Sequence, residues 1–280
     1  MKFLVYSQAW IALLAGSLAW VSTFSISGDP DLLPIHGLIS LTTFSLYGWH
    51  KIFAYSKANS EYKLLERYSF VASYPTASKI LYTAVAIIAL YWYLTGSFSF
   101  PLLLGLFGLG LAVFYVLPRV VSQLAGLRSS YIKPFVIASA WAIVTALLPT
   151  LQIEPDLNPL QLCLLFGERF GHTLMVAFCF DWRDREMDEK SGLKNWSTKS
   201  FENNIIACFL ALLIAFVCRY SIPNDNLIAA ITKLGILPGY WVAMAFSARI
   251  EDYFSDFTYD FWYNGILGLP AVGLIILVLL

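Results

Sequence analysis

Long apolar runs alternate with shorter polar segments along all 280 residues of the chain. Most runs contain about twenty residues, which is the length that a helix needs to cross the hydrocarbon core of a membrane. Nine such ranges can be drawn, at approximately 5–26, 32–54, 76–95, 98–118, 134–151, 159–181, 203–221, 226–247 and 259–280. The pattern predicts an all-α polytopic membrane protein in which residues 1–280 form a single transmembrane domain.

Two local features bear on these ranges. The first range resembles the apolar region of a signal peptide, but the stretch from Trp10 to Ile26 is long for one, so we interpret it as the first spanning helix. Pro149 lies near the end of the fifth range, and we expect it to kink that helix because proline removes a backbone donor.

The basic residues are distributed unequally between the connecting segments. The segments 27–31, 96–97, 152–158 and 222–225 contain acidic residues but no lysine or arginine, whereas fifteen of the eighteen basic residues fall on the opposite side. The positive-inside rule then predicts a cytoplasmic N-terminus and a C-terminus on the far side of the inner (plasma) membrane of a bacterium. The longer connections on the basic side are expected to form a cytoplasmic cap.

The composition agrees with a membrane protein. The chain is 59% hydrophobic and only 13% charged, with a mean hydropathy of +0.68, whereas a soluble domain carries about 25% charged residues. The net charge is zero, which gives no indication of a nucleic-acid partner. The spacing of the four cysteines matches no zinc or redox motif, so we interpret them as packing residues.

A group of carboxylates marks the end of the sixth range. Asp181, Asp184 and Asp188 lie on one stripe of a helix and reach the water boundary there. Carboxylates in this arrangement favour Mg²⁺, which commonly joins a few protein oxygens to substrate phosphates. Basic residues expected on the same side would line a diphosphate site. These are Arg119, Arg128, Lys133 and Lys194. The alternative is a solvated helix end with local ion pairs such as Asp181–Arg185.

The segment 181–188 reads Asp-Trp-Arg-Asp-Arg-Glu-Met-Asp and is followed by Gly192. It resembles the second aspartate-rich motif of the UbiA superfamily of intramembrane prenyltransferases. The segment 115–119 and the stretch from Tyr131 to Trp141 are similar to that family's loop and helix after the fourth span. The resemblance implies nine transmembrane helices around a central cavity with a cytoplasmic cap. It also implies Mg²⁺ as cofactor, with an isoprenoid diphosphate and a lipophilic acceptor as substrates.

The chain departs from this family at the first aspartate-rich motif. The family carries that motif at the cytoplasmic end of the second span, where residues 46–57 of this chain contain no carboxylate and include His50 and Lys51. A second acidic group, Asp252, Asp256 and Asp260, precedes the last range at spacings of four. One hypothesis is that these acids compensate for the missing motif. The alternative is that they cap the N-terminus of the last helix.

Three ionisable residues lie inside the sixth range. Glu168, Arg169 and His172 are expected to form a polar wall or a proton-handling group in the central cavity, since intramembrane charges usually face a cavity or a partner. The alternative is a hydrogen bond between helices. For His50, next to Trp49, anchoring at the membrane interface is the simpler interpretation.

Two functions remain open from the sequence. The first is Mg²⁺-dependent transfer of a prenyl group from an isoprenoid diphosphate to a lipophilic acceptor. The second is a non-catalytic relative that binds a lipid or quinone, or acts as a subunit of a membrane complex with a membrane-protein partner. The second motif favours the enzyme, and the missing first motif favours the alternative. An ion-coupled transporter is less consistent, because no internal repeat is found.

Overall fold

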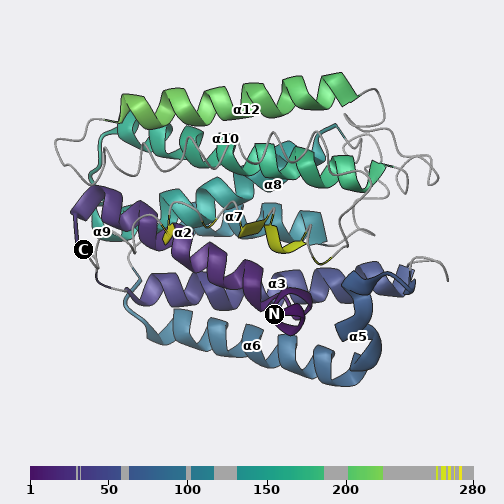
Figure 1. Cartoon of the computed structure of the whole chain (residues 1–280). Coiled ribbons are helices and arrows are strands. Elements are labelled where there is room, and N and C mark those ends of the chain that lie inside the picture. The colour runs from purple at the N-terminus through teal and green to yellow at the C-terminus, as the bar shows by residue number, and fades with distance from the viewer. Residues whose placement is uncertain are drawn as a thin grey trace.

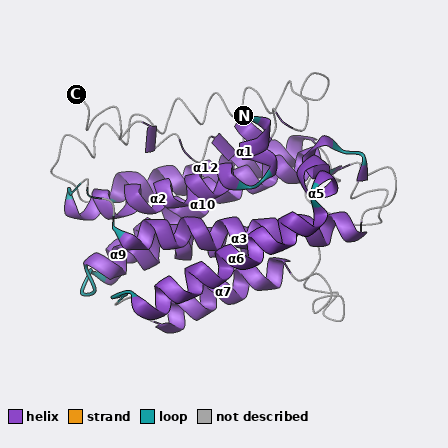
Figure 2. Cartoon of the chain, turned by 90° about the horizontal axis from the view of Figure 1, so that it is seen from below, coloured by secondary structure: helices purple, strands orange, loops and turns teal. Residues whose placement is uncertain are grey.

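The computed structural model describes most of the chain up to residue 222 and scattered positions near the C-terminus. The described residues are 1–29, 31, 33–57, 63–98, 102–116, 131–185, 201–222, 257, 260–262, 264–265, 268 and 271–272. Every regular element within them is a helix (Figure 2). The all-α prediction is therefore confirmed for this part of the chain.

The helices follow the expected ranges closely. The elements in order are α1 (Lys2–Tyr6), α2 (Ala9–Ser27), α3 (Pro34–Lys57), the 3₁₀ helix η1 (Glu66–Tyr68), α5 (Ser69–Ser73), α6 (Pro75–Thr95), α7 (Leu102–Val116), α8 (Lys133–Ala142), the π-helix η3 (Ile143–Leu147), α9 (Leu148–Ile153), α10 (Pro159–Arg183) and α12 (Phe201–Ser221). They occupy seven of the nine expected ranges. The range 226–247 and most of 259–280 lie outside the described residues.

Four helical segments are long and apolar enough to cross a membrane by length and composition. They are Ala9–Ser27, Pro75–Thr95, Lys133–Ile153 and Pro159–Arg183. A membrane-embedded helical protein is the class that such segments indicate. The full set of nine spans stays a prediction.

The long helices run side by side along one direction (Figures 1 and 2). α3 packs between α2 and α6, and α10 packs between α8 and α12. Between them lies an apolar core that includes Leu18, Ile35, Trp141, Leu174 and Met175. This packing places the C-terminal ends of α3 and α10 at the same end of the bundle, on the right in Figure 1.

The first expected range is not one continuous helix. The helix is interrupted between α1 and α2, where Gln8 adopts a left-handed conformation with φ of 69°. The phenol of Tyr82 donates a hydrogen bond to the Ser7 carbonyl, and Gln8 Nε2 donates to the Tyr6 carbonyl. These bonds satisfy the carbonyl groups of Ser7 and Tyr6 at the interruption. Buried backbone carbonyl groups need such hydrogen-bond partners. The expectation of one helix over 5–26 is therefore wrong in its first turn.

Pro149 lies where the helix departs from regular α-helical geometry. It lies in the first turn of α9, and the preceding turn is the π-helix η3. Proline has no N–H to donate to the carbonyl four residues earlier, which belongs to Thr145. That carbonyl instead accepts a hydrogen bond of 2.8 Å from Ser22 Oγ on α2. A hydroxyl from another helix thus replaces the missing backbone donor.

The α10–α12 contact depends on small residues. A Cβ atom on Gly171 would collide with the Ala211 carbonyl and would lie 2.7 Å from the Ala215 nitrogen. Cys179 and Cys208 are buried in the same core, and the four cysteines form no disulfide. Close approach of two backbones is the usual role of glycine between membrane helices.

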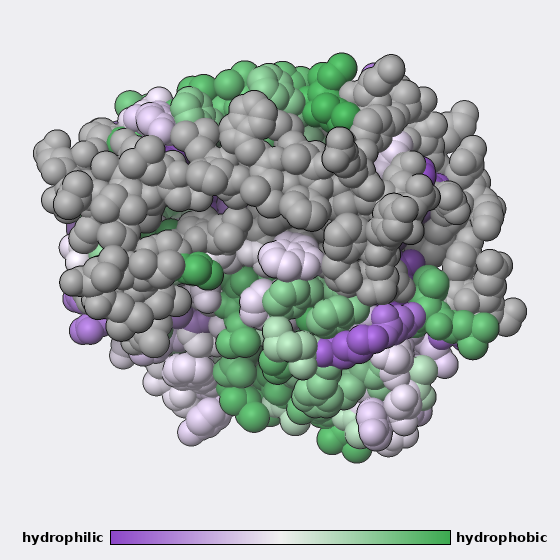
Figure 3. All heavy atoms as spheres, viewed as in Figure 1, coloured by the Kyte–Doolittle hydropathy of each residue, from purple (hydrophilic) through white to green (hydrophobic). Residues whose placement is uncertain are grey.

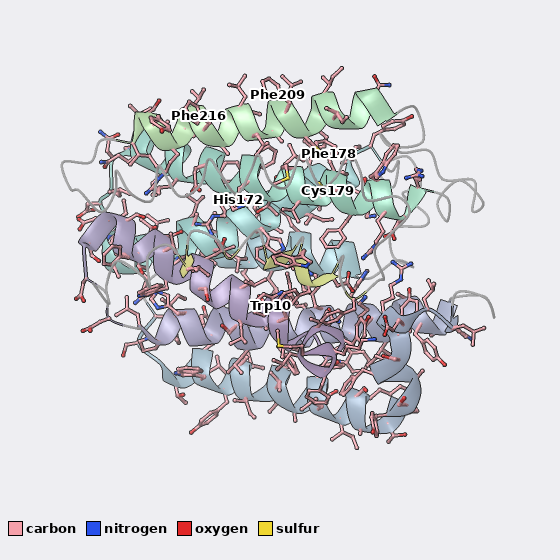
Figure 4. The ribbon with its side chains drawn as sticks, in the orientation of Figure 1. Trp10, His172, Phe178, Cys179, Phe209 and Phe216 are labelled. Atoms are coloured by element: carbon pink, nitrogen blue, oxygen red, sulfur yellow. The ribbon has the colours of Figure 1, made fainter. Side chains whose placement is uncertain are left out.

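The outer faces of α6 and α12 expose large apolar side chains. They include Ile87, Tyr91 and Leu94 on α6, and Phe209 and Leu213 on α12. Figure 3 shows hydrophobic residues along the upper edge of the molecule, where α12 runs, and Figure 4 labels Phe209 on that helix. Soluble proteins rarely expose apolar surface this continuously, so these faces suit contact with lipid.

Candidate functional site

Charged side chains from four helical elements and from Asp260 converge where α3 and α10 end. α3 supplies one lysine, η1 one arginine, the start of α8 one lysine, and the end of α10 two aspartates and an arginine. We call this group the ionic cluster. Its members are Lys51, Arg67, Lys133, Asp181, Arg183, Asp184 and Asp260.

Asp181 is the most deeply buried carboxylate of the ionic cluster. It lies in the last turn of α10 and is 1% exposed. Lys133 Nζ donates to its Oδ1 atom at 2.9 Å. Its Oδ2 atom has no hydrogen-bond partner within the described part of the chain. One oxygen of this acid is therefore satisfied, and the other remains able to accept a proton or a hydrogen bond.

Asp184 terminates α10 and is held by two arginines. Arg183 contacts both of its oxygens, with Nε 2.9 Å from Oδ1 and Nη2 3.1 Å from Oδ2. Arg67 Nη1 donates to the same Oδ1 at 2.8 Å. Burial by itself raises the pKa of Asp184, but the charges of Arg183 and Arg67 outweigh burial and hold that pKa well below its usual range. Asp184 is therefore ionised at neutral pH.

Asp260 links the C-terminal region to the same site. Arg183 Nη1 donates to its Oδ1 at 2.5 Å, and Lys51 Nζ lies 3.9 Å from its Oδ2. Asp184 and Asp260 thus share Arg183 between them. Of the three acids expected to compensate for the missing motif, Asp260 is the one that the structure describes. Asp252 and Asp256 lie outside the described residues.

Several other expected site residues also fall outside the described part of the chain. They are Asp188, Arg119, Arg128 and Lys194. The structure does bring Asp181, Asp184, Asp260 and Lys133 to one place, although Asp181 and Asp260 are far apart in sequence. Arg185 stacks over the Trp182 ring at 4.1 Å, while Asp181 pairs with Lys133. The local pair Asp181–Arg185 is thus not the contact that holds Asp181.

The described carboxylates fit a magnesium ion poorly. Mg²⁺ takes six oxygen ligands in near-octahedral geometry, usually from one or two carboxylates with water and phosphate. Both oxygens of Asp184, both of Asp260 and one of Asp181 already face basic side chains. Among the described residues, no group of three or more His, Cys, Asp or Glu side chains is placed to hold a metal ion. The magnesium site stays a prediction, since Asp188 is not among these residues.

Sequence reasoning did not select Lys51, Arg67 or Arg183 as site residues. From the sequence, these three residues are assigned only to the positively charged side of the predicted topology. The signal that identifies Lys51 is its position, because it lies in the segment where the similar family carries its first acidic motif. Arg67 is 66 or more residues from every other member except Lys51, so only the fold reveals its contact with Asp184.

A second polar group lies in the middle of α10. Glu168, Arg169 and His172 are all buried, and Figure 4 shows His172 on the inner side of α10. Arg169 Nη2 donates to Ser22 Oγ at 3.1 Å, and Arg169 Nη1 lies 3.5 Å from Thr145 Oγ1. Glu168 Oε2 lies 3.9 Å from Arg169 Nε.

For Arg169 these contacts correspond to hydrogen bonding between helices, which was the alternative to a polar wall or proton-handling group. Comparison of the chain with protein-family models, with curated proteins and with solved structures found no match. The function that follows is therefore proposed from the chain's own residues.

Proposed function

We propose that the chain is a UbiA-like membrane protein that binds an isoprenoid diphosphate at the ionic cluster and transfers its prenyl group to a lipophilic acceptor. The observation that carries this proposal is the convergence of Lys51, Arg67, Lys133 and Arg183 at one end of a bundle of apolar helices. A charged head and an apolar tail are the two parts of such a substrate, and this end of the bundle offers a surface for each.

The finer architecture belongs to the same proposal. The chain then has nine spans around a cavity, with the N-terminus in the cytoplasm and the C-terminus on the far side of a bacterial inner membrane. The ionic cluster lies at the cytoplasmic face, where soluble diphosphates are made available. The positive-inside distribution of lysine and arginine supports this orientation.

The chain's own residues suggest how the transfer proceeds. The bond between the allylic carbon and the diphosphate oxygen breaks, and its electron pair leaves with the diphosphate. The basic side chains stabilise the charge that develops on the leaving oxygens. The acceptor then forms a bond to the allylic carbon, and its proton passes to Asp181 Oδ2, which is buried beside Lys133.

A second candidate function is a non-catalytic relative that binds a lipid or quinone or serves in a membrane complex. Two observations favour it. Residues 46–57 contain no carboxylate, and the described carboxylates of the ionic cluster are engaged by basic side chains. Such a protein would bind an anionic lipid headgroup at the ionic cluster without chemical change.

Labelled farnesyl diphosphate distinguishes the two functions. Purified full-length protein in lipid nanodiscs is incubated with the labelled donor and an extract of membrane quinone precursors, and both binding and label transfer are measured. Transfer that is lost in Asp181→Asn supports the enzyme. Binding without transfer supports the non-catalytic relative. Absence of binding rejects both uses of the ionic cluster.

A further inference from the structure

The end of α3 brings a positive charge to the place where the similar family has acids. Lys51 of that segment reaches the ionic cluster, with Nζ 3.9 Å from Asp260 Oδ2. It also lies within electrostatic range of Arg67, Arg183 and Asp184. A lysine in this position cannot ligate a cation, but it can contact a phosphate oxygen directly.

The charge balance of the ionic cluster also favours a phosphate ligand over a metal ion. Four basic side chains, Lys51, Arg67, Lys133 and Arg183, face three carboxylates, Asp181, Asp184 and Asp260, so the seven residues carry one net positive charge. A divalent cation brought to this group would meet a net positive charge rather than the negative excess that favours cation binding. A diphosphate is the opposite case, because it brings several negative charges to a group with a positive excess.

The hydrogen-bond geometry gives an independent argument. Arg183 holds both oxygens of Asp184 in a bidentate contact, and Arg67 shares one of them. A metal ion bound at Asp184 would compete with these charge-assisted bonds, which are the stronger class of hydrogen bond. Phosphate oxygens, in contrast, are acceptors for guanidinium and ammonium donors and do not compete for the carboxylate oxygens.

We infer that the ionic cluster binds an isoprenoid diphosphate without a divalent metal ion, with Lys51, Arg67, Lys133 and Arg183 supplying the positive charge. This inference rests on the proposed function, since it concerns the same site. Asp184 and Asp260 then act as positioning residues, because their carboxylates hold the side chains of Arg67, Arg183 and Lys51 in place.

The test compares binding of farnesyl diphosphate with and without divalent metal. Full-length protein in nanodiscs is titrated in excess EDTA and in excess Mg²⁺, with farnesol as the tail-only probe and inorganic pyrophosphate as the headgroup-only probe. We expect dissociation constants for farnesyl diphosphate that agree within about threefold in the two buffers, and weaker binding of farnesol.

Variants locate the positive charge. Lys51→Gln is expected to weaken binding of farnesyl diphosphate in EDTA about tenfold, the usual scale for one charge-assisted contact, whereas Lys51→Arg retains it. Lys79→Gln is the matched control, because Lys79 is exposed at the start of α6 and lies outside the ionic cluster. Thermal melting without ligand verifies that each variant is folded, and the wild-type comparison does not depend on any variant.

The outcomes separate the inference from the proposed function. Binding that requires Mg²⁺ overturns metal-independent binding but leaves prenyl diphosphate as the ligand. Binding in EDTA that Lys51→Gln and Lys79→Gln weaken equally also overturns the inference, since the charge would then act from outside the ionic cluster. No binding in either buffer removes the proposed function, and the inference falls with it.

Discussion

Arg67 Nη1 donates a hydrogen bond of 2.8 Å to Asp184 Oδ1, which joins the segment before α5 to the end of α10. The two residues are 117 positions apart in the sequence, and the side chain of Arg67 is only 7% exposed. An ion pair so little exposed to water is screened less by salt than a surface pair. The contact therefore ties two distant parts of the bundle together at the candidate site.

Removing Arg67 tests this tie. Arg67→Met keeps much of the side-chain volume but removes one of the two arginines that contact Asp184, so we expect a loss of about 1–3 kcal/mol in stability. Thermal unfolding in nanodiscs measures the change. The exposed pair Lys2–Glu66 provides the control, because Lys2→Met removes an ion pair of the kind that contributes little. Equal effects of the two substitutions would contradict the assignment.

The low pKa of Asp184 predicts a specific pH dependence. A carboxyl group whose pKa falls on folding stabilises the protein above its unfolded value of about 3.9, and this contribution is lost as the pH falls through the folded pKa. The melting temperature should therefore decrease below about pH 4. Asp184→Asn should be less stable at neutral pH and should show a flatter acid profile. Parallel profiles for the two proteins would rule out this role for Asp184.

Asp181 is expected to affect transfer more than binding. Asp181→Asn keeps the shape of the side chain but removes the base, so label transfer should fall at least about a hundredfold, as for other general bases. Binding of farnesyl diphosphate should change less than transfer, because the four basic residues remain. Equal losses of binding and transfer would show that Asp181 acts through Lys133 rather than as a base.

The α10–α12 contact gives a prediction about stability alone. Gly171→Ala places a methyl group against the Ala211 carbonyl and should destabilise the protein by about 1–3 kcal/mol, the usual cost of overpacking. Gly110→Ala is the matched control, since a Cβ there meets nothing within 4 Å. Proteolysis and thermal melting of the two variants are compared. Normal stability of Gly171→Ala would mean that the two helices are less closely packed than the structure shows.

The helices were predictable from the sequence because each is encoded locally. An apolar run of about twenty residues between polar segments is sufficient to predict a spanning helix, and the bounds of α6 and α10 agree with the expected ranges within a few residues. The break at Gln8 was not predictable, because it depends on Tyr82, which reaches the Ser7 carbonyl from another helix. Contacts between distant segments leave no local pattern.

The candidate site was predictable only in part. Asp181 and Asp184 were identified by their spacing on one helix, and Lys133 by its position on the same side. The roles of Arg67 and Lys51 depend on how η1 and α3 meet the end of α10, which apolar periodicity does not specify. The sequence therefore indicated where the acids gather, while the fold shows which basic side chains contact them.

The hydrogen bonds from Ser22 to the Thr145 carbonyl and from Arg169 to Ser22 connect α2, η3 and α10 deep inside the bundle. In a membrane, an apolar side chain gains little free energy when a contact with lipid is replaced by a contact with another helix. Hydrophobicity alone therefore does not select one rotation or shift of an inserted helix over another. The shared Ser22 hydroxyl contributes to that choice here, because sliding any of the three elements by one residue would break its hydrogen bonds. Insertion into the membrane and correct packing of the inserted helices are thus separable events. A Ser22→Ala protein should enter the membrane normally but lose the unique register of α2 against η3 and α10.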